Sequence, residues 1–193
     1  YLTCEENYAG YFARPSADNA QRSAKEQASL RRNGVTSTLG RHNWASVEGD
    51  EFKRWDATVK GASAAEDYRN VANTYGWVVE IDPFKPEQRP VKRTALGRFA
   101  HEGCWPAPVK EGKPVVFYMG DDSQGEYIYK FVSKRAYKST PRGVAAGNQY
   151  LDEGTLYVAK FAANGSGSWV ALEYGRNGLD ASNAAYPFDD QAD

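Results

Sequence analysis

The sequence has little of several features that mark large classes of protein. Only two of its 193 residues are cysteines, Cys4 and Cys104, which is too few for a disulfide-rich secreted scaffold, although the two could pair with each other. Lysine and arginine number 24 against 25 aspartates and glutamates, so no net field favours nucleic acid or an anionic membrane. No apolar run approaches the roughly 20 residues of a membrane span. We therefore expect neither a nucleic acid nor a membrane as a partner.

Several sequence motifs of common enzyme and metal-binding classes are also missing. There is no Gly-x-Ser-x-Gly nucleophile turn, no Ser/His/Asp order, no phosphate-cradling glycine loop and no paired Cys-x-x-Cys. A serine hydrolase, a P-loop enzyme and a zinc finger are therefore disfavoured. His42 stands alone beside Arg41 and Asn43, and we assign it no role.

The chain is instead rich in glycine and aromatic residues. Eighteen glycines, nine prolines and 13% aromatic residues favour many turns and a β-rich fold over a helical bundle. β-Branched and aromatic runs predict strands at residues 75–81, 115–119, 126–132, 155–161 and 168–172. The Asn164-Gly165 step predicts a hairpin between the last two strands, and residues 120–125 predict another. We expect an antiparallel all-β fold, either a sandwich, a barrel or a propeller of about four blades.

The stretch around residues 14–34 departs from this pattern. It is rich in Ala, Ser, Gln and charge, has hardly any large apolar residue, and ends at Gly34, a plausible helix stop. We expect residues 18–32 to form an exposed helix or an excursion from the main fold, with a mobile loop as the alternative.

Residues 98–105 contain the densest group of side chains that could bind a metal or take part in catalysis, since His101, Glu102 and Cys104 fall within four positions. On a regular strand Glu102 and Cys104 face the same side, opposite to His101. Carboxylate oxygen suits hard cations and thiolate sulfur suits softer iron or zinc, so the pair could bind a metal. The alternative is an exposed glutamate beside a buried structural cysteine.

Two further segments offer possible metal ligands. Cys4 precedes Glu5 and Glu6, and a ligating thiolate there would need a nearby cation, because adjacent acids do not lower the pKa of a thiol. A buried structural Cys4 is the alternative. The loop with Asp121 and Asp122 could provide hard oxygen donors for calcium. The alternative is a simple hairpin turn in which the Asp121 side chain forms a hydrogen bond with its own backbone.

Together these segments resemble the PhoX family of bacterial alkaline phosphatases. The matching stretches occur in the family's order and span nearly the whole chain. They are Thr3-Cys4-Glu5-Glu6-Asn7, Tyr75-Gly76-Trp77-Val78-Val79-Glu80-Ile81-Asp82-Pro83, Lys92-Arg93-Thr94-Ala95-Leu96-Gly97-Arg98-Phe99 with His101-Glu102-Gly103, Tyr118-Met119-Gly120-Asp121-Asp122, and Leu151-Asp152-Glu153-Gly154-Thr155-Leu156-Tyr157.

The resemblance implies a β-propeller that binds iron and calcium, hydrolyses small phosphate monoesters, and works in the periplasm or outside the cell. By the same match, Cys4 is an iron-ligating thiolate, Glu102 a carboxylate ligand and Asp121 a weaker candidate for a metal ligand. The full-length protein is expected to be a monomer, with residues 1–193 forming part of one propeller domain truncated at both ends.

One departure from the family pattern limits what this chain can do. The family's Arg-Pro-Glu segment, with its phosphate-binding arginine, has no match here, so we expect little or no activity from this chain alone. Three alternatives stay open: a calcium-stabilised propeller module without catalysis, another propeller hydrolase such as a lactonase, and a Cys4–Cys104 disulfide in place of the iron site.

Overall fold

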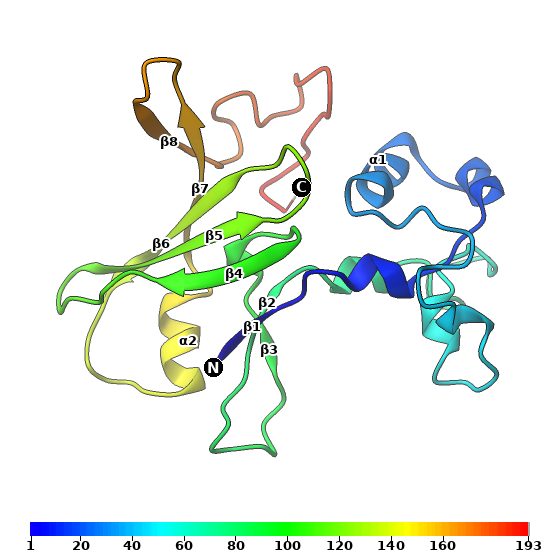
Figure 1. The fold of residues 1–193 in the computed structure, drawn as a ribbon, viewed down its shortest axis with the longest axis horizontal. Helices are drawn as coiled ribbons and strands as arrows, with labels where there is room; N and C mark the ends of the chain where they lie inside the picture. The colour runs from blue at the N-terminus through cyan, green and yellow to red at the C-terminus, as the bar shows by residue number, and fades with distance from the viewer. Residues whose placement is uncertain (193) are drawn as a thin grey trace. The chain divides into compact units, whose positions relative to one another are not determined.

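The structure is a computed structural model that describes residues 1–192 (Figure 1). The chain divides into two compact units. The first comprises Tyr1–Glu6 together with the chain from Trp77 onward, and the second comprises Asn7–Gly76. No helix among the described residues is both long and apolar enough to cross a membrane.

Two antiparallel sheets form the first unit. The smaller sheet has the strand order β1-β2-β3, and the larger one runs β4-β5-β6-β7-β8, so its strands are neighbours in chain order (Figure 1). Every pair of adjacent strands is antiparallel. The strands are β1 Leu2–Cys4, β2 Val78–Glu80, β3 Val91–Lys92, β4 His101–Pro106, β5 Pro114–Asp121, β6 Ile128–Ala136, β7 Gly154–Phe161 and β8 Gly167–Ala171.

These strands confirm the predicted antiparallel β-structure and each predicted strand. The hairpin at Gly165 also forms, with a positive φ of 83° that glycine adopts without strain. β2 is shorter than expected, because the preceding 3-10 helix extends to Thr74 and Gly76 takes a positive φ of 95°. Within the described residues the sheets do not close, so the propeller stays a prediction.

One face of the larger sheet covers an apolar core. On β5, the buried residues Val115, Phe117 and Met119 alternate with more exposed ones, which is the period-two pattern of a strand with one face in a core. Phe131 of β6 is fully buried in the same core. The helix α2, Val144–Tyr150, lies against β6 and adds Tyr150 to the core (Figure 1).

A buried arginine joins the smaller sheet to α2 and to the segment that follows it. Arg93 follows β3, is inaccessible to solvent, and donates to Glu80 of β2 and to Asp152 after α2. Its Nη2 also lies 3.3 Å from the carbonyl oxygen of Val144. A Cβ atom at Gly147 would collide with the Arg93–Glu80 pair, so only glycine lets α2 approach this closely.

The second unit contains short helices and long irregular segments. Its small apolar core includes Phe12, which is fully buried, and Leu30 and Val35. Its one α-helix is α1, Ala24–Arg32. The 3-10 helices are η1 Tyr8–Tyr11, η2 Ser16–Gln21, η3 Trp44–Ser46, η4 Lys53–Trp55 and η5 Val71–Thr74, and the first unit adds η6 Thr94–Leu96.

Residues 14–34 contain η2 and α1, as the helical prediction expected, and belong to the second compact unit; in α1 only Leu30 is buried. Asp18 is only 2% exposed and forms ion pairs with Arg14 at 3.0 Å and with Arg22 at 2.9 Å, both of which are also buried. Its other carboxylate oxygen accepts a hydrogen bond from the backbone N–H of Val59. The burial of these three charged residues was not predicted from the sequence, because charged side chains that satisfy one another can be buried without large apolar neighbours.

Candidate metal centre

The candidate site begins at an irregularity in strand β4. His101 pairs with Asp121 of β5, and Gly103 pairs with Gly120, so Glu102 is an extra residue without a partner across the ladder. Such a β-bulge changes the direction of nearby side chains and is common next to functional sites. It also breaks the expected alternation: Glu102 is exposed, whereas Cys104 packs against the apolar core.

Three carboxylates converge around this bulge. Oxygens of Glu6, Glu102 and Asp122 lie within 4.8 Å of one another. Strand β1 lies against β4 and ends two residues before Glu6, and the backbone N–H of Asp122 donates to the carbonyl oxygen of Ala100 at 3.0 Å. The carboxylates of Glu102 and Asp122 form no hydrogen bond or ion pair with any described residue. Three acids so close together repel one another unless a cation lies between them.

Cys4 lies beside this cluster. Its side chain packs partly against the apolar core, and burial raises the pKa of the thiol. The negative charges of Glu102 and Glu6 raise that pKa further. The thiol is therefore protonated at neutral pH, and a cation between the sulfur and the carboxylates would be needed to favour the thiolate.

Glu5 lies between the candidate ligands Cys4 and Glu6 in the chain, and its hydrogen bonds hold this segment in place. Its carboxylate accepts hydrogen bonds from Nζ of Lys92 at 2.7 Å and from the backbone N–H of Trp77 at 3.2 Å. Its own N–H donates to the carbonyl oxygen of Trp77 at 3.0 Å. Because Cys4 and Glu6 flank Glu5, these bonds fix where both neighbours lie.

Asp121, the third predicted ligand, lies at the end of β5 but is not one of the three converging carboxylates. Its Oδ1 accepts a hydrogen bond from the backbone N–H of Ser123 at 3.0 Å, which is the local turn that the sequence offered as an alternative to calcium binding. Asp122, its neighbour, faces Glu102 instead. The structure thus brings Cys4 and Glu102 together and gives Asp121 a turn-forming contact.

His101 lies next to Glu102 but is completely buried. Its ring stacks on Phe99 with 3.7 Å between the centroids, and Nε2 lies 2.9 Å from the carbonyl oxygen of Gly97. Burial lowers the pKa of His101 to about 4, so the ring is neutral at pH 7. With Nε2 as the donor, the unpartnered Nδ1 can only accept a hydrogen bond.

The two cysteines are free thiols in this structure. Burial raises the pKa of Cys104 to about 12, and the proximity of Cys4 contributes to the rise. Cys104 is half-buried and packs against the apolar core, which fits the structural cysteine that the sequence analysis offered as an alternative. A disulfide between Cys4 and Cys104 is not present in the structure.

The sequence analysis noted Glu6 and Asp122 as acids that could bind a metal, but it did not select either as a partner of Glu102. Glu6 could not be placed against the bulge without knowing that β1 lies beside β4. Asp122 could not be placed there without knowing the position of the bulge opposite the end of β5. The donors fit a metal site, because carboxylate oxygens suit hard cations and a thiolate suits softer ones such as iron or zinc.

Comparison with known proteins adds to this geometry. The sequence profile of a family described as alkaline phosphatase PhoX matches residues 1–193. Among solved structures, Pseudomonas fluorescens PhoX in complex with vanadate, a transition state analogue, is 42% identical with a TM-score of 0.76. The match covers 100% of this chain but only 30% of that chain. No curated protein sequence matches this chain.

Proposed function

Because this chain belongs to the alkaline phosphatase PhoX family, we propose that it supplies part of the metal site of an enzyme that hydrolyses small phosphate monoesters. The observation that carries the proposal is the convergence of Glu6, Glu102 and Asp122 within 4.8 Å beside the thiol of Cys4. The chain spans 30% of the length of the matched PhoX structure, and the remaining catalytic groups would lie in other parts of the full-length protein.

We propose two kinds of metal at this site. Calcium would be held by the carboxylates of Glu6, Glu102 and Asp122, because it takes six to eight oxygen ligands and three acids provide part of such a set. Iron would be held by the thiolate of Cys4 with Glu102 as a shared ligand. Asp121 stays a weaker candidate, since its carboxylate is engaged by the backbone of Ser123.

Bound metals would supply the concentrated positive charge that phosphoryl transfer from a dianionic ester requires and that this chain, with a net charge of -1, lacks. The chain's own residues provide the framework for that charge. Glu5 fixes the positions of Cys4 and Glu6 through Lys92 and the backbone of Trp77, and the bulge in β4 aims Glu102 at Asp122.

The same family membership supports three broader proposals. The five-stranded sheet with its short hairpins would form one part of a β-propeller. The full-length protein would be a monomer exported to the periplasm or secreted. The unmatched phosphate-binding arginine would belong to the part of that protein outside residues 1–193.

Metal analysis of the full-length protein tests the proposal. We expect iron together with calcium, and phosphatase activity toward p-nitrophenyl phosphate that is lost on chelation. Substituting Glu102→Gln keeps the shape of the side chain but removes a charged ligand, so calcium affinity should fall by more than about tenfold. Glu111→Gln, in the exposed turn before β5, is the matched control and should leave metal content and activity unchanged.

Other outcomes would favour the alternatives. Calcium without iron would support a non-catalytic module, and lactone turnover without phosphomonoester turnover would support a lactonase. A mass showing Cys4 and Cys104 bonded to each other after alkylation without reductant would contradict the iron site. Robust phosphomonoester hydrolysis by residues 1–193 alone would overturn the expectation that this chain is incomplete.

A further inference from the structure

His101 contains a buried polar atom without a partner. Its side chain is inaccessible to solvent, and within residues 1–192 its Nδ1 is the one buried side-chain nitrogen or oxygen that has no hydrogen-bond partner. Nε2 faces the carbonyl oxygen of Gly97, which can only accept, so Nε2 carries the proton and Nδ1 of the neutral ring is an acceptor. A buried acceptor that no donor of the chain reaches lowers stability, whereas an apolar side chain of similar size would not. Local rules of this kind are broken mainly at functional sites.

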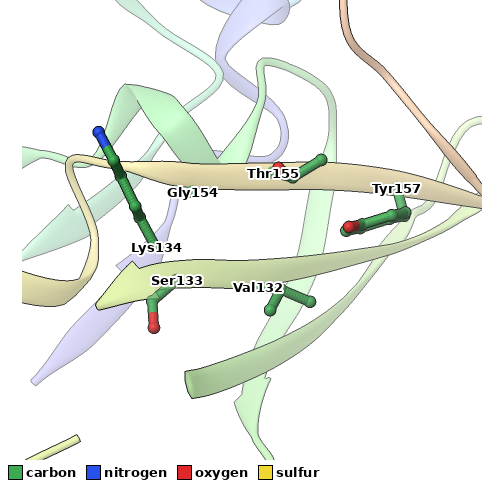
Figure 2. A pocket seen from close by; sticks show the side chains of 6 residues that line it. All are labelled: Val132, Ser133, Lys134, Gly154, Thr155 and Tyr157. Carbon is green, nitrogen blue, oxygen red and sulfur yellow. The ribbon is translucent and has the colours of Figure 1, made fainter. Parts of the chain in front are cut away.

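The shallow hollow between β6 and β7 contains no comparable atom. It has a volume of about 190 Å³. The hydroxyl groups of Ser133 and Thr155 and the ammonium group of Lys134 all have partners in the described chain. The residues that line the hollow are Val132, Ser133, Lys134, Gly154, Thr155 and Tyr157 (Figure 2). The unusual group of this sheet is therefore His101, on the other side of β5.

His101 lies directly before the bulge residue Glu102 of the candidate metal centre. Its backbone pairs with Asp121 of β5, and its N–H donates to the carbonyl oxygen of Phe99 at 2.9 Å. The His101 ring is buried, whereas Glu102 is exposed. Contacts that fix the His101 ring therefore also fix the backbone from which Glu102 projects.

Two kinds of contact fix the His101 ring. The ring stacks on Phe99 with 3.7 Å between the centroids, and Phe99 stacks on Tyr129 of β6 with 4.3 Å between theirs. The Nε2 atom lies 2.9 Å from the carbonyl oxygen of Gly97. The stack sets the plane of the ring, and the hydrogen bond sets its rotation within that plane.

Gly97, the acceptor of this hydrogen bond, is itself held in place. Its N–H donates to the carbonyl oxygen of Thr94 at 3.0 Å, and its φ is 90°. A Cβ atom at this position would lie 2.8 Å from Cδ2 of Leu156, so glycine alone lets the backbone follow this course. Thr94 follows the buried Arg93, which pairs with Glu80 of the smaller sheet. The imidazole thus links the bulge to a segment that is fixed from elsewhere in the first unit.

On the basis of the proposed metal site, we propose that His101 is a positioning residue, which fixes the bulge so that Glu102 projects towards Glu6 and Asp122. It needs no contact with a metal. Groups that orient metal ligands from behind typically change metal affinity by about 10- to 100-fold when they are removed. An imidazole suits this role because it both stacks and donates through Nε2, and the unpartnered Nδ1 is the other nitrogen of the same ring.

Calcium affinity of the full-length protein tests the role of the hydrogen bond. His101→Met is similar in size but cannot donate, so the calcium dissociation constant should rise by about tenfold or more. His101→Gln places an N–H donor near Gly97 and should stay within about threefold of wild type. Wild-type calcium affinity in His101→Met would refute the proposal, and an equal loss in both variants would overturn the role of the hydrogen bond.

Two further variants separate positioning from a general loss of stability. Val115→Ala removes packing from the same core at the opposite end of β5, so it lowers stability but should leave the calcium affinity of the folded protein within about twofold of wild type. Phe99→Leu removes the stacking partner of His101 and should weaken calcium binding by about threefold or more, which provides a test even if His101→Met does not fold. Equal calcium affinities of Phe99→Leu and Val115→Ala would contradict the proposal.

Amide hydrogen exchange of the metal-free full-length protein gives a readout that does not depend on the metal. The N–H of Asp122 donates to the carbonyl oxygen of Ala100 at 3.0 Å, next to the bulge. His101→Met should speed exchange of this amide by about tenfold or more, while exchange around Phe131 in β6 stays within about twofold of wild type. Unchanged exchange at Asp122 would contradict the role of His101. A wild-type protein that binds no metal would instead contradict the proposed function.

Discussion

The two units of this chain are stabilised in different ways. In the first unit, β5 buries Val115, Phe117 and Met119 and β6 buries Phe131 in one apolar core, and backbone ladders join five consecutive strands. In the second unit, backbone ladders are almost absent from residues 7–76, and a buried ion-pair network of Arg14, Asp18 and Arg22 lies beside a small core. The difference teaches that the first unit depends on apolar packing and backbone ladders, whereas the second unit depends on a small apolar core and a few buried polar contacts.

The largest effect is expected in the apolar core of the first unit. Phe131 of β6 is completely buried, so Phe131→Ala removes a large side chain and leaves a cavity. We expect a loss of about 4 kcal/mol in the free energy of unfolding, measured by urea denaturation. Phe84→Ala is the matched control, because Phe84 is 92% exposed and should contribute little. A loss at position 131 no larger than at position 84 would show that the core is not the main support of this unit.

The next largest effect is expected at Asp18. Asp18→Asn preserves the shape of the side chain but removes the carboxylate that the buried guanidinium groups of Arg14 and Arg22 share, which leaves Arg22 only the half-exposed Glu26 at 3.8 Å. A loss of about 3 kcal/mol should follow, because breaking a buried ion pair leaves an uncompensated charge. Amide hydrogen exchange should become faster in α1. An equal acceleration of exchange in β6 would contradict the proposed difference between the units.

Asp50→Asn serves as the control for this substitution. Asp50 pairs with Lys53 at 2.5 Å, but its side chain is 90% exposed, so water can replace the pair. We expect no measurable change in stability. A comparable loss at both positions would mean that burial does not determine the strength of these ion pairs.

The pH dependence of stability sharpens the same comparison. Burial alone would raise the pKa of Asp18, but hydrogen bonds from Val59, Arg22 and Arg14 outweigh it and lower the pKa below its usual value. Since the folded-state pKa is depressed, the stabilisation is complete above about pH 4 and is lost as the pH falls through the folded-state pKa. Between pH 7 and pH 3, wild type should lose more stability than Asp18→Asn, as measured by urea midpoints. Equal losses would exclude Asp18 as a source of acid sensitivity.

The contrast between the units also explains how much of the fold could be predicted from the sequence. Alternation of apolar residues around Phe117 and the turn at Asn164 and Gly165 predicted β5 and the β7–β8 hairpin, because periodicity and turn chemistry are local. The burial of Asp18 was missed, since its partner Val59 lies 41 residues away and no local pattern marks it. A polar stretch is expected to be exposed unless its counter-charges are known to converge.

The candidate metal centre was predictable to a similar degree. Donor chemistry marked Cys4 and Glu102 as possible ligands, the family resemblance selected them, and the structure brings them close enough for the charge of Glu102 to raise the pKa of Cys4. Regular alternation failed at Glu102, because a β-bulge turns this residue away from the core that contains Cys104. Asp122 faces Glu102 where Asp121 was expected, and one position in a loop is beyond the precision of sequence patterns.

The smallest predicted effect concerns the start of α1. The Ser23 hydroxyl accepts a hydrogen bond from the N–H of Glu26 at 3.2 Å, and the Glu26 carboxylate accepts one from the N–H of Ser23 at 2.8 Å. Ser23→Ala removes one half of this capping box and should cost about 1 kcal/mol, with faster amide exchange confined to the first turn of the helix. Ser23→Asp keeps an oxygen acceptor at the N-cap and should retain wild-type stability. An equal loss in the free energy of unfolding for Ser23→Ala and Asp18→Asn would mean that α1 depends on its cap as heavily as on the buried ion pairs. That result would contradict the idea that the ion-pair network dominates the stability of the second unit.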